Sequence, residues 1–452
     1  MTDVTTGRGT ATIECTGCGL TRTMSEALGE GGRLKLPPCR GRHPHLDAFE
    51  PGGCGNDSRL MLVGASNLWF ATTQSVIVMP HTTPAERQQD LADQIKAAVG
   101  ADLADYQGQP KFLRNLLAGR VDVADLSDAQ LMEVLERALA PAPPEGERLD
   151  RQESWNPIDL LVPEWSYLQQ REPLGAEHDD PSGLMLSGRS LDPGLPGEVT
   201  RVLAVDKLRK VNALFGFTRV DAMDRVNDLP QRMAPLTRDR QPTWTVATED
   251  HGEGVFLQLD EARVAAWEAD LEASDIWIAH VQAHRRNYQN RYSETADVVI
   301  DPDVRMRPPR YWLLHTMAHL LIREMAMQCG YSAASLSERI YAWVPTPSRE
   351  SAAGLLICTT ASDSDGTLGG LVQLSEPARL AQVINAALRR AERCSSDPIC
   401  ATRTPRDPED FLHGAACHCC AMASETSCER ANRFLDRRFV INLPGSHLGF
   451  FQ

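Results

Sequence analysis

The chain has 452 residues, of which 42% are hydrophobic and 24% charged, and its formal net charge at pH 7 is −15. This length is enough for two to four domains with full cores. An acidic chain is a poor non-specific DNA binder, so any contact with nucleic acid has to be local or made together with a partner. No apolar run reaches the roughly 18 residues needed to span a bilayer, and the polar start MTDVTTGRGT does not resemble a secretory signal, so we expect a cytoplasmic protein.

The first cysteines form a compact group. Cys15 and Cys18 stand in C-x2-C spacing, and Cys39 and Cys54 follow. Glycines flank Cys18, so the backbone can turn tightly and direct its N–H groups at the sulfurs. We therefore expect a zinc-ribbon-like module over residues 1–80, with these four thiolates as ligands. Such a module can bind nucleic acid or protein, or it can simply staple a small subdomain. Two histidines that could replace a cysteine are His43 and His45.

Strand and helix patterns follow this module. Apolar runs at 59–64 and 75–79 are typical of strands. Residues 85–99 and 127–140 carry apolar side chains at helical spacing, and Ser127 is well suited to cap the second helix.

The middle of the chain, 81–300, is predicted to be mainly helical. PAPPEGE at 141–147 is a linker or a domain edge, and 173–198 has the Pro, Gly, Asp and Ser content of a long exposed loop. Helices are predicted at 261–273 and 279–292. The tryptophans of this region are expected in the core, although a stacking surface for bases is the alternative.

A long apolar helix is predicted at 308–330, with Gly330 as its end. His315 and His319 lie on one face of it. Their H-x3-H spacing can bind a metal, but the glutamate of an H-E-x-x-H motif is absent. Buried, hydrogen-bonded histidines that pack the helix are therefore the default interpretation.

Two buried strands are predicted next, at 340–344 and 354–360. The loop after them, ASDSDGTLGGL, has glycines that would let backbone N–H groups approach an anion, although a tight turn is the simpler interpretation. The residues of interest in this loop are Asp365, Gly366 and Gly369.

An amphipathic helix at 377–394 leads into a second cysteine cluster. Arginines lie on both sides of that cluster and would suit contacts with phosphate, or would only offset nearby glutamates and the negative charge of a four-thiolate zinc site. The arginines we consider for nucleic acid are Arg389, Arg390, Arg393, Arg430 and Arg433.

Six cysteines lie close together near the C-terminus, and a structural zinc ion is the expected ligand. Cys417 and Cys420 share a C-x2-C turn. Cys428 begins the amphipathic run CERANRFLDRR, where a helix N-terminus would favour its thiolate. Cys400 or Cys394 would complete a tetrahedral site. The sixth, Cys419, is the first candidate for a cysteine that binds no metal.

Signatures of catalysis are missing from the sequence. We find no P-loop, no Rossmann fingerprint and no G-x-S-x-G elbow. The cysteine sites are typical of closed, structural zinc. We therefore expect a zinc-stapled, non-enzymatic protein.

Several stretches together resemble a known family. The run from RYWLLHTMAHLLIRE through GLLICTT and CSSDPIC to GAACHCCAMASETSCERANRFLDR resembles the zinc-binding (MZB) domain of MrfA-type helicases. With the N-terminal CTGC and GASNLWFATTQSVIVMP, the chain is similar to the DrmB family of the DISARM anti-phage defence system.

The resemblance implies a zinc-binding subunit without a motor of its own, which pairs with a DrmA-like superfamily 2 helicase. It further implies recognition of DNA, single-stranded or with an overhang, and modulation of the helicase ATPase. Cys417, Cys420 and Cys428 match the metal ligands of the MrfA-type domain, with Cys400 or Cys394 as the fourth. We thus expect two zinc ions in all and no membrane partner.

The expected fold is α+β and multidomain. It consists of the N-terminal module, a mixed α/β body and a C-terminal α/β domain at 301–452 with a four-cysteine zinc site. Two alternative functions remain open, a pure protein scaffold and a metal-dependent nuclease or hydrolase. The residues considered for the second are His315, His319, Glu324 and Asp363 or Asp365.

Overall fold

The computed structural model describes residues 12–23, 39–54, 70–80, 84–140, 156–170, 182–218, 234, 236–238, 244–292, 302–347, 349–359, 369–405, 413–424 and 426–451. None of the helices in these ranges combines the length and the apolar character needed to cross a membrane. The chain forms two compact units. The first comprises Met1–Ile77, Glu172–Gly175 and Met185–Gln452, and the second comprises Val78–Arg171 and Ala176–Leu184.

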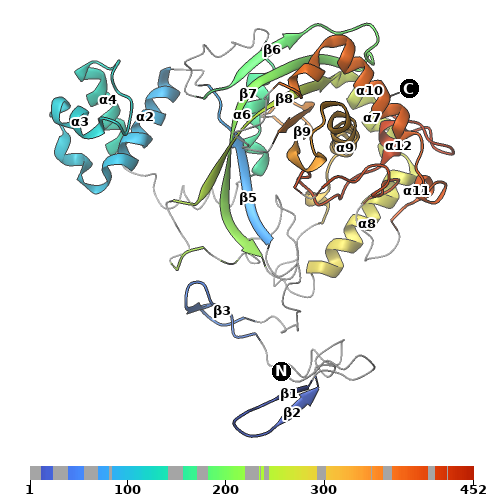
Figure 1. Ribbon diagram of the computed structural model, residues 1–452, viewed down its shortest axis with the longest axis horizontal. Coiled ribbons are helices and arrows are strands. Elements are labelled where there is room, and N and C mark those ends of the chain that lie inside the picture. The colour runs from blue at the N-terminus through green and yellow to red at the C-terminus, as the bar shows by residue number, and fades with distance from the viewer. Residues whose placement is uncertain are drawn as a thin grey trace. The chain divides into compact units, whose positions relative to one another are not determined.

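The first unit is built on one antiparallel sheet with the strand order β5-β7-β8-β10-β9, in which β6 also pairs with β7. Figure 1 shows this sheet curled beside helix α9 (Pro309–Cys329), which is seen nearly end on. The sheet strands are β5 (Phe70–Ile77), β6 (Met185–Arg189), β7 (Val199–Thr218), β8 (Ala247–Leu259), β9 (Leu336–Trp343) and β10 (Ala352–Thr359).

Strand β7 organises the sheet because it is long enough to pair with three strands. One edge of β7 pairs with β8 along most of its length. The other edge pairs with β6 near Val202 and with β5 near Val211. The register with β8 shifts between Val205 and Leu208. Such a bulge bends a strand and increases its twist, which lets the two halves of β7 meet different partners.

Helix α9 is buried on every side, so it shows no polar stripe that would mark a surface helix. Strands β9 and β10 pack against it, and so do α7, α10 and α12. The helix begins with Pro309 at its first position and ends at Gly330, whose φ of 74° is left-handed. The prediction of a helix at 308–330 with Gly330 as its stop is thus confirmed.

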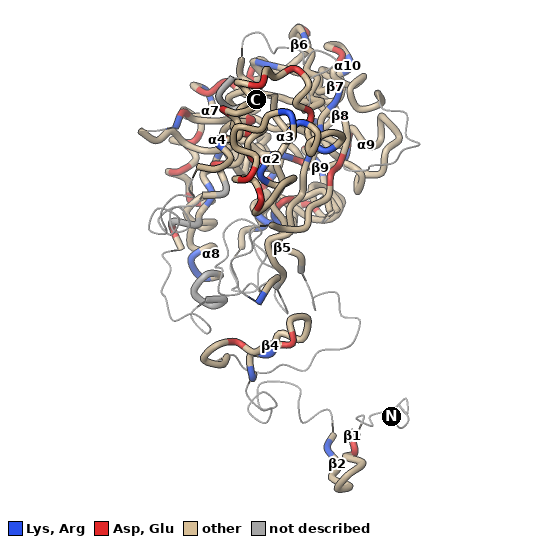
Figure 2. Tube along the Cα trace, turned by 90° about the vertical axis from the view of Figure 1, so that its left-hand side faces the viewer, with Lys and Arg blue, Asp and Glu red and all other residues tan. Residues whose placement is uncertain are grey.

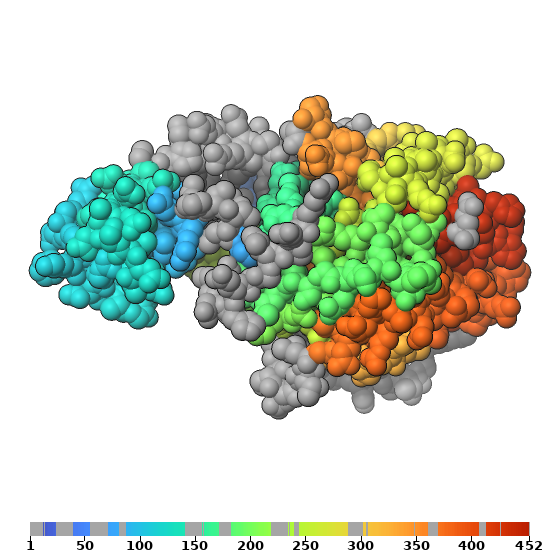
Figure 3. All heavy atoms as spheres, turned by 90° about the horizontal axis from the view of Figure 1, so that it is seen from above, coloured from blue at the N-terminus to red at the C-terminus, as the bar shows by residue number. Residues whose placement is uncertain are grey.

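Further helices complete the first unit. Helix α10 lies on the surface beside the segment that follows β6, as the orange and green regions in Figure 3 show. Asn385 of α10 donates to the carbonyl of Gly194 at 2.8 Å, which fixes this contact. These helices are α7 (Glu261–Glu272), α8 (Asp275–Tyr292), α10 (Pro377–Ala391), α11 (Ile399–Thr402) and α12 (Arg437–Val440), with the 3-10 turns η6 (Pro302–Arg305), η7 (Ala333–Ser335) and η8 (Val372–Ser375).

The second unit is a group of short helices around its own small core. Leu113, Leu131 and Leu135 are among the side chains with no more than 1% exposure. Ser127 caps α4 and forms a capping box with Gln130, so the expected cap is confirmed. The elements are α2 (Pro84–Val99), η3 (Gly100–Tyr106), α3 (Pro110–Leu117), α4 (Asp128–Leu139), η4 (Pro157–Leu160) and α6 (Val162–Leu168).

The N-terminal part of the first unit forms two small hairpins. Strand β1 (Thr12–Glu14) pairs with β2 (Thr21–Thr23), and β3 (Arg42–His43) pairs with β4 (Ala48–Phe49). The strand expected at 59–64 lies outside the described residues, whereas the strand expected at 75–79 is the end of β5.

The structure differs from the expected domain plan in the middle of the chain. The region 81–300, expected to be mainly helical, carries α2, α3, α4, α6, α7 and α8 and also contributes β6, β7 and β8 to the central sheet. Strand β6 also falls inside the expected loop at 173–198. One apolar core runs from Val199 to Phe451, so residue 300 does not separate two cores. The charged residues interspersed along β7 weaken the strand pattern, because only its inward side chains meet the core.

A buried ion cluster fastens α7 to the start of α9. The guanidinium of Arg310, which is 1% exposed, donates to both carboxylate oxygens of Glu268 and to Glu261. It also donates to the backbone carbonyls of Trp343 and Ala352 at the end of the β9–β10 hairpin. These partners satisfy most of the donors of a charge that would otherwise be costly to bury.

We expect Glu268→Gln to lower the free energy of unfolding by about 3 kcal/mol, because it leaves the buried Arg310 charge without its main partner. Denaturant unfolding followed by circular dichroism measures this. Asp270→Asn, on the exposed side of the same helix, is the matched control and should change stability by less than about 0.5 kcal/mol. Equal stability of the two variants would contradict the assignment.

Candidate metal centre

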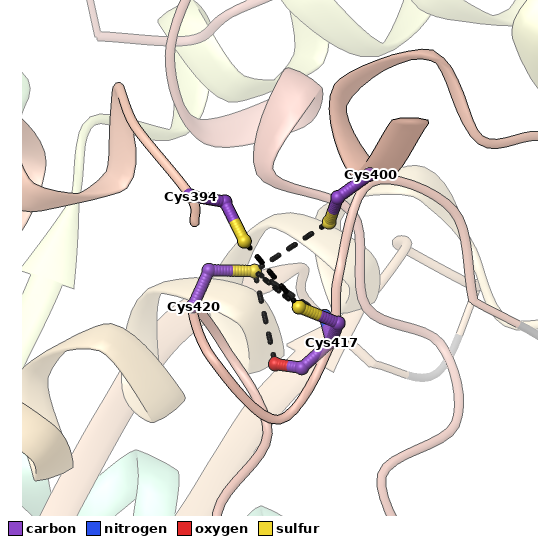
Figure 4. Close-up of side chains that lie close together, drawn as sticks. All are labelled: Cys394, Cys400, Cys417 and Cys420. Carbon is purple, nitrogen blue, oxygen red and sulfur yellow. Dashed lines mark hydrogen bonds between the residues drawn. The ribbon is translucent and has the colours of Figure 1, made fainter. Parts of the chain in front are cut away.

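Four of the C-terminal cysteines meet at one point, as Figure 4 shows. Cys394 follows α10, Cys400 lies in α11, and Cys417 and Cys420 belong to one turn. The Sγ–Sγ distances are 3.4 Å for Cys394–Cys417, 3.7 Å for Cys400–Cys420 and 3.7 Å for Cys417–Cys420. Four thiolates bound tetrahedrally to zinc at 2.3 Å would be separated by about 3.8 Å, so the geometry suits a zinc ion.

Backbone and side-chain donors surround these sulfurs. The N–H of Cys417 donates to the Cys420 sulfur at 3.2 Å, and that of Ser396 donates to the Cys394 sulfur at 3.4 Å. Such bonds stabilise thiolates and orient metal ligands. The side chains of Ala416, Ala421 and Leu435 cover the cluster on its inner side.

Arg437 is the charged partner of the cluster and has no exposed surface. Its guanidinium donates to the carbonyls of Ala391 and Ala415, to Asp397 at 3.0 Å and to the Cys400 sulfur at 3.6 Å. A zinc ion with four thiolates carries a net charge of about −2, which the guanidinium partly offsets. A hydrogen bond from Cys420 and the charge of Arg437 lower the pKa of the Cys400 thiol to about 5.

The turn with Cys417 and Cys420 is fastened to α9 by Arg323. This side chain donates to the carbonyls of His418, Cys419 and Met422. The Cys419 side chain itself is exposed and lies outside the cluster, in agreement with its expected role as a cysteine that binds no metal. All 12 cysteines of the chain lie in the described ranges, and none of them forms a disulfide.

Cys428 is not part of the four-cysteine cluster, which corrects the expectation that it supplies the third thiolate. The run after it is not a helix: Ala431, Asn432 and Phe434 have positive φ, and α12 begins only at Arg437. The left-handed residues turn Cys428 inward to a different group, made with His315, His319 and Glu338. The run CERANRFLDRR has apolar residues at helical spacing and therefore predicted a helix. Hydrogen bonds made by side chains determine the loop conformation instead, and these cannot be predicted from the spacing.

This second group is closed to solvent. Its members are 0–4% exposed, so a substrate cannot reach them. Glu324, considered for a hydrolase, is not in the group and pairs with Arg390 at 3.1 Å. Asp363, Asp365 and Gly366 lie outside the described residues, and Gly369 is described only as the start of a turn before η8.

The N-terminal cysteines are seen as two pairs. The N–H groups of Gly17 and Cys18 bond the Cys15 sulfur and lower the pKa of that thiol. Gly41 donates to the Cys39 sulfur at 3.4 Å, and a Cβ on this glycine would lie 3.2 Å from the Cβ of Cys54. Within the described residues no group of three or more metal-binding side chains includes these cysteines, so a shared ion at this end stays a prediction.

The predicted basic residues divide into two classes. Arg389, Arg390 and Arg393 are exposed at the end of α10. Arg430 and Arg433 are buried, at 4% and 8% exposure, so neither presents its guanidinium to a ligand, contrary to the prediction. Arg430 donates to the Tyr311 hydroxyl at 3.1 Å and lies over its ring. Figure 2 shows basic and acidic positions interspersed along the trace rather than gathered in one basic stretch.

Two family models match the chain. One, described as a domain of unknown function (DUF8724), matches residues 1–70, and the other, described as the MrfA Zn-binding domain, matches residues 317–421. The second range contains all four clustered cysteines and ends before Cys428.

Known proteins similar to the chain include the DISARM protein DrmB of Bacillus paralicheniformis. It is 28% identical over 427 residues, which cover 92% of this chain and 70% of that protein. The crystal structure of the DUF1998 helicase MrfA bound to DNA aligns with 55% of this chain and 23% of that chain, with 10% identity and a TM-score of 0.23.

The matched domain and the cysteine geometry together define a protein with an MrfA-type zinc-binding domain. Over nearly its whole length, moreover, the chain is a homologue of DrmB. The resemblance found in the sequence is confirmed, and the residues that fit the zinc ion of this domain are Cys394, Cys400, Cys417 and Cys420.

We expect Cys420→Ser to remove one equivalent of zinc from the purified chain, because three thiolates bind zinc far more weakly than four in a closed site. Elemental analysis by mass spectrometry measures the loss. Cys419→Ser, one residue away but outside the cluster, should retain the full zinc content. A loss of zinc in the control, or none in Cys420→Ser, would show that the ligand set is wrong.

Proposed function

We propose that this chain is a non-catalytic, zinc-binding subunit of a DISARM-type anti-phage complex, located in the cytoplasm. In this role it pairs with a DrmA-like superfamily 2 helicase and helps that helicase to recognise single-stranded DNA or DNA ends. The observation that carries the proposal is the similarity to DrmB over 92% of the chain.

The chemistry of the described residues supports a structural use of metal. Both groups of metal-binding side chains offer four protein donors, which leaves no coordination position for a water or a substrate. The first is only partly exposed and the second is fully buried. A hydrolase needs an open metal position, so these groups favour a non-catalytic role over the nuclease alternative.

We assign the contact with DNA to the exposed arginines at the end of α10. Arg389 lies in the last turn of α10 and Arg393 lies two residues beyond its end at Ala391, and Cys394 of the metal cluster follows directly. Arg390 beside them has a side chain that is 57% exposed and pairs with Glu324. The zinc cluster fixes the end of the helix, so the guanidinium groups are held where they can contact successive phosphates.

The test uses the full chain in complex with a DrmA-like helicase. We expect Arg389→Ala/Arg393→Ala to weaken single-stranded DNA binding roughly 10-fold for all sequences and to reduce the salt dependence by about 1.4 in slope, since each phosphate contact on a single strand contributes about 0.7. Fluorescence anisotropy of labelled DNA at several salt concentrations measures both quantities, and helicase ATPase is read in the same samples.

Arg379→Ala, an exposed arginine at the other end of α10, is the matched control and should leave the slope unchanged. An unchanged slope for the double variant would contradict the DNA contact. A chain that neither binds the helicase nor changes its ATPase would contradict the role as a subunit.

A further inference from the structure

A second group of metal-binding side chains lies buried in the first unit. It joins three segments: His315 and His319 of α9, Glu338 of β9 and Cys428 of the C-terminal loop. The donor atoms of all four side chains lie within 4.8 Å of one another. We propose that these four residues form a second, structural zinc site, separate from the four-cysteine cluster.

The distances suit four ligands around one ion. His315 Nε2 lies 2.9 Å from Glu338 Oε1 and 3.3 Å from Cys428 Sγ, and His319 Nε2 lies 3.5 Å from Glu338 Oε2. Ligands of a tetrahedral zinc ion, at about 2.0 Å for N or O and 2.3 Å for S, lie about 3.3 to 3.6 Å apart. Binding of the ion would need only small shifts of these side chains.

Two polar atoms in the group face one another without a hydrogen bond between them. His319 Nε2 and Glu338 Oε2 are buried and lie 3.5 Å apart, and neither makes a hydrogen bond. Both side chains are at least nine-tenths buried, at 0% and 4% exposure. Two acceptor atoms that face one another in the core destabilise the fold, and an ion bound to both atoms would satisfy them.

The surroundings orient the side chains as metal ligands are oriented. His319 Nδ1 bonds the carbonyl of Ala421 at 2.9 Å, which fixes the proton on Nδ1 and leaves the lone pair of Nε2 directed into the group. The backbone N–H of Glu429 donates to Glu338 Oε1 at 3.1 Å. Ala421 immediately follows Cys420, so the same turn serves both metal groups.

Cys428 is prepared as a thiolate. The N–H groups of Arg430 and Asn432 both donate to its sulfur at 3.3 Å. Asn432, with φ 59°, is held in this left-handed conformation by two side-chain bonds to the backbone of Ala423. Converging N–H groups from a left-handed turn form a concave site for an anion, here the sulfur.

The charges favour a divalent ion. One thiolate, one carboxylate and two neutral imidazoles around Zn²⁺ sum to about zero. A neutral site is far easier to bury than separate charges, and this group is at most 4% exposed. The softer thiolate and imidazole donors select zinc over calcium or magnesium, which prefer oxygen ligands.

The test measures the zinc content of the full, untagged chain by elemental mass spectrometry. We expect His319→Ala and Glu338→Gln each to lose one equivalent of zinc. Cys358→Ser, which changes a buried cysteine on the neighbouring strand β10, is the matched control and should lose none. The double variant with His319→Ala and Cys420→Ser should lose two equivalents of zinc. Full zinc content in His319→Ala and Glu338→Gln would overturn the proposal and leave a metal-free ion network.

A second measurement does not depend on the folding of these variants. Zinc-edge X-ray absorption is recorded on the chain with Cys15→Ser and Cys39→Ser, which removes any N-terminal site. If both sites are occupied, the spectrum should show sulfur ligands at about 2.3 Å and nitrogen or oxygen ligands at about 2.0 to 2.1 Å in a ratio of about five to three. A spectrum with sulfur ligands alone would overturn the proposal.

Discussion

Helix α9 imposes the constraint on which the first unit depends, because nearly all of its side chains as far as Ala326 are buried, among them Arg310, His315 and His319, and have to be covered. The β9–β10 hairpin covers one side. Part of the rest is covered by the C-terminal segment, 413–451, whose described residues (413–424 and 426–451) include only the single-turn helix α12 and a few bridges. A segment with so few backbone hydrogen bonds has to be held in place by interactions of its side chains. The side chains that make these interactions are cysteines, histidines and buried charged residues.

Buried arginines account for much of this fastening. Arg437 bonds the carbonyls beside the cysteine cluster, and Arg438 pairs with Asp436. Asp436 in turn accepts from His280 of α8 at 2.9 Å. Gly414 is required beside this pair, because a Cβ there would lie 2.0 Å from an Asp436 oxygen. A charge is tolerated in such a core only with its partners in place, so these contacts specify one arrangement of the loop.

The sequence predicted the regular elements of the first unit well where their apolar patterns are long. The helices at 261–273, 308–330 and 377–394 and the strands at 340–344 and 354–360 correspond to α7, α9, α10, β9 and β10. It did not predict β7 or β8, because charged residues along these strands interrupt the kind of apolar run that marked 340–344 and 354–360 as strands. The C-x2-C spacing identified Cys417 and Cys420 as ligands, since both lie in one turn.

The remaining ligands were beyond reach of the sequence because they come together only in the fold. In the sequence analysis Cys394 and Cys400 were alternatives for one ligand position, but both belong to the four-cysteine cluster in the structure. Cys428 was assigned by its nearness in sequence, whereas a left-handed turn directs it to α9. Arg430 and Arg433 carry charge and were therefore expected at the surface, but their partners lie in the core. Besides the H-x3-H pair His315 and His319, Glu338 was the available signal of the second group, since a carboxylate inside a fully buried strand needs a partner.

The central claim is that bound metal holds the C-terminal segment against α9. Hydrogen exchange of the full chain, before and after zinc is removed by a chelator, tests it most directly. The account predicts that amides of 413–451 and of α9 lose protection by at least roughly 10-fold, while those of α4 in the second unit exchange as before. Unchanged protection of 413–451 in chain verified to be free of zinc would contradict it.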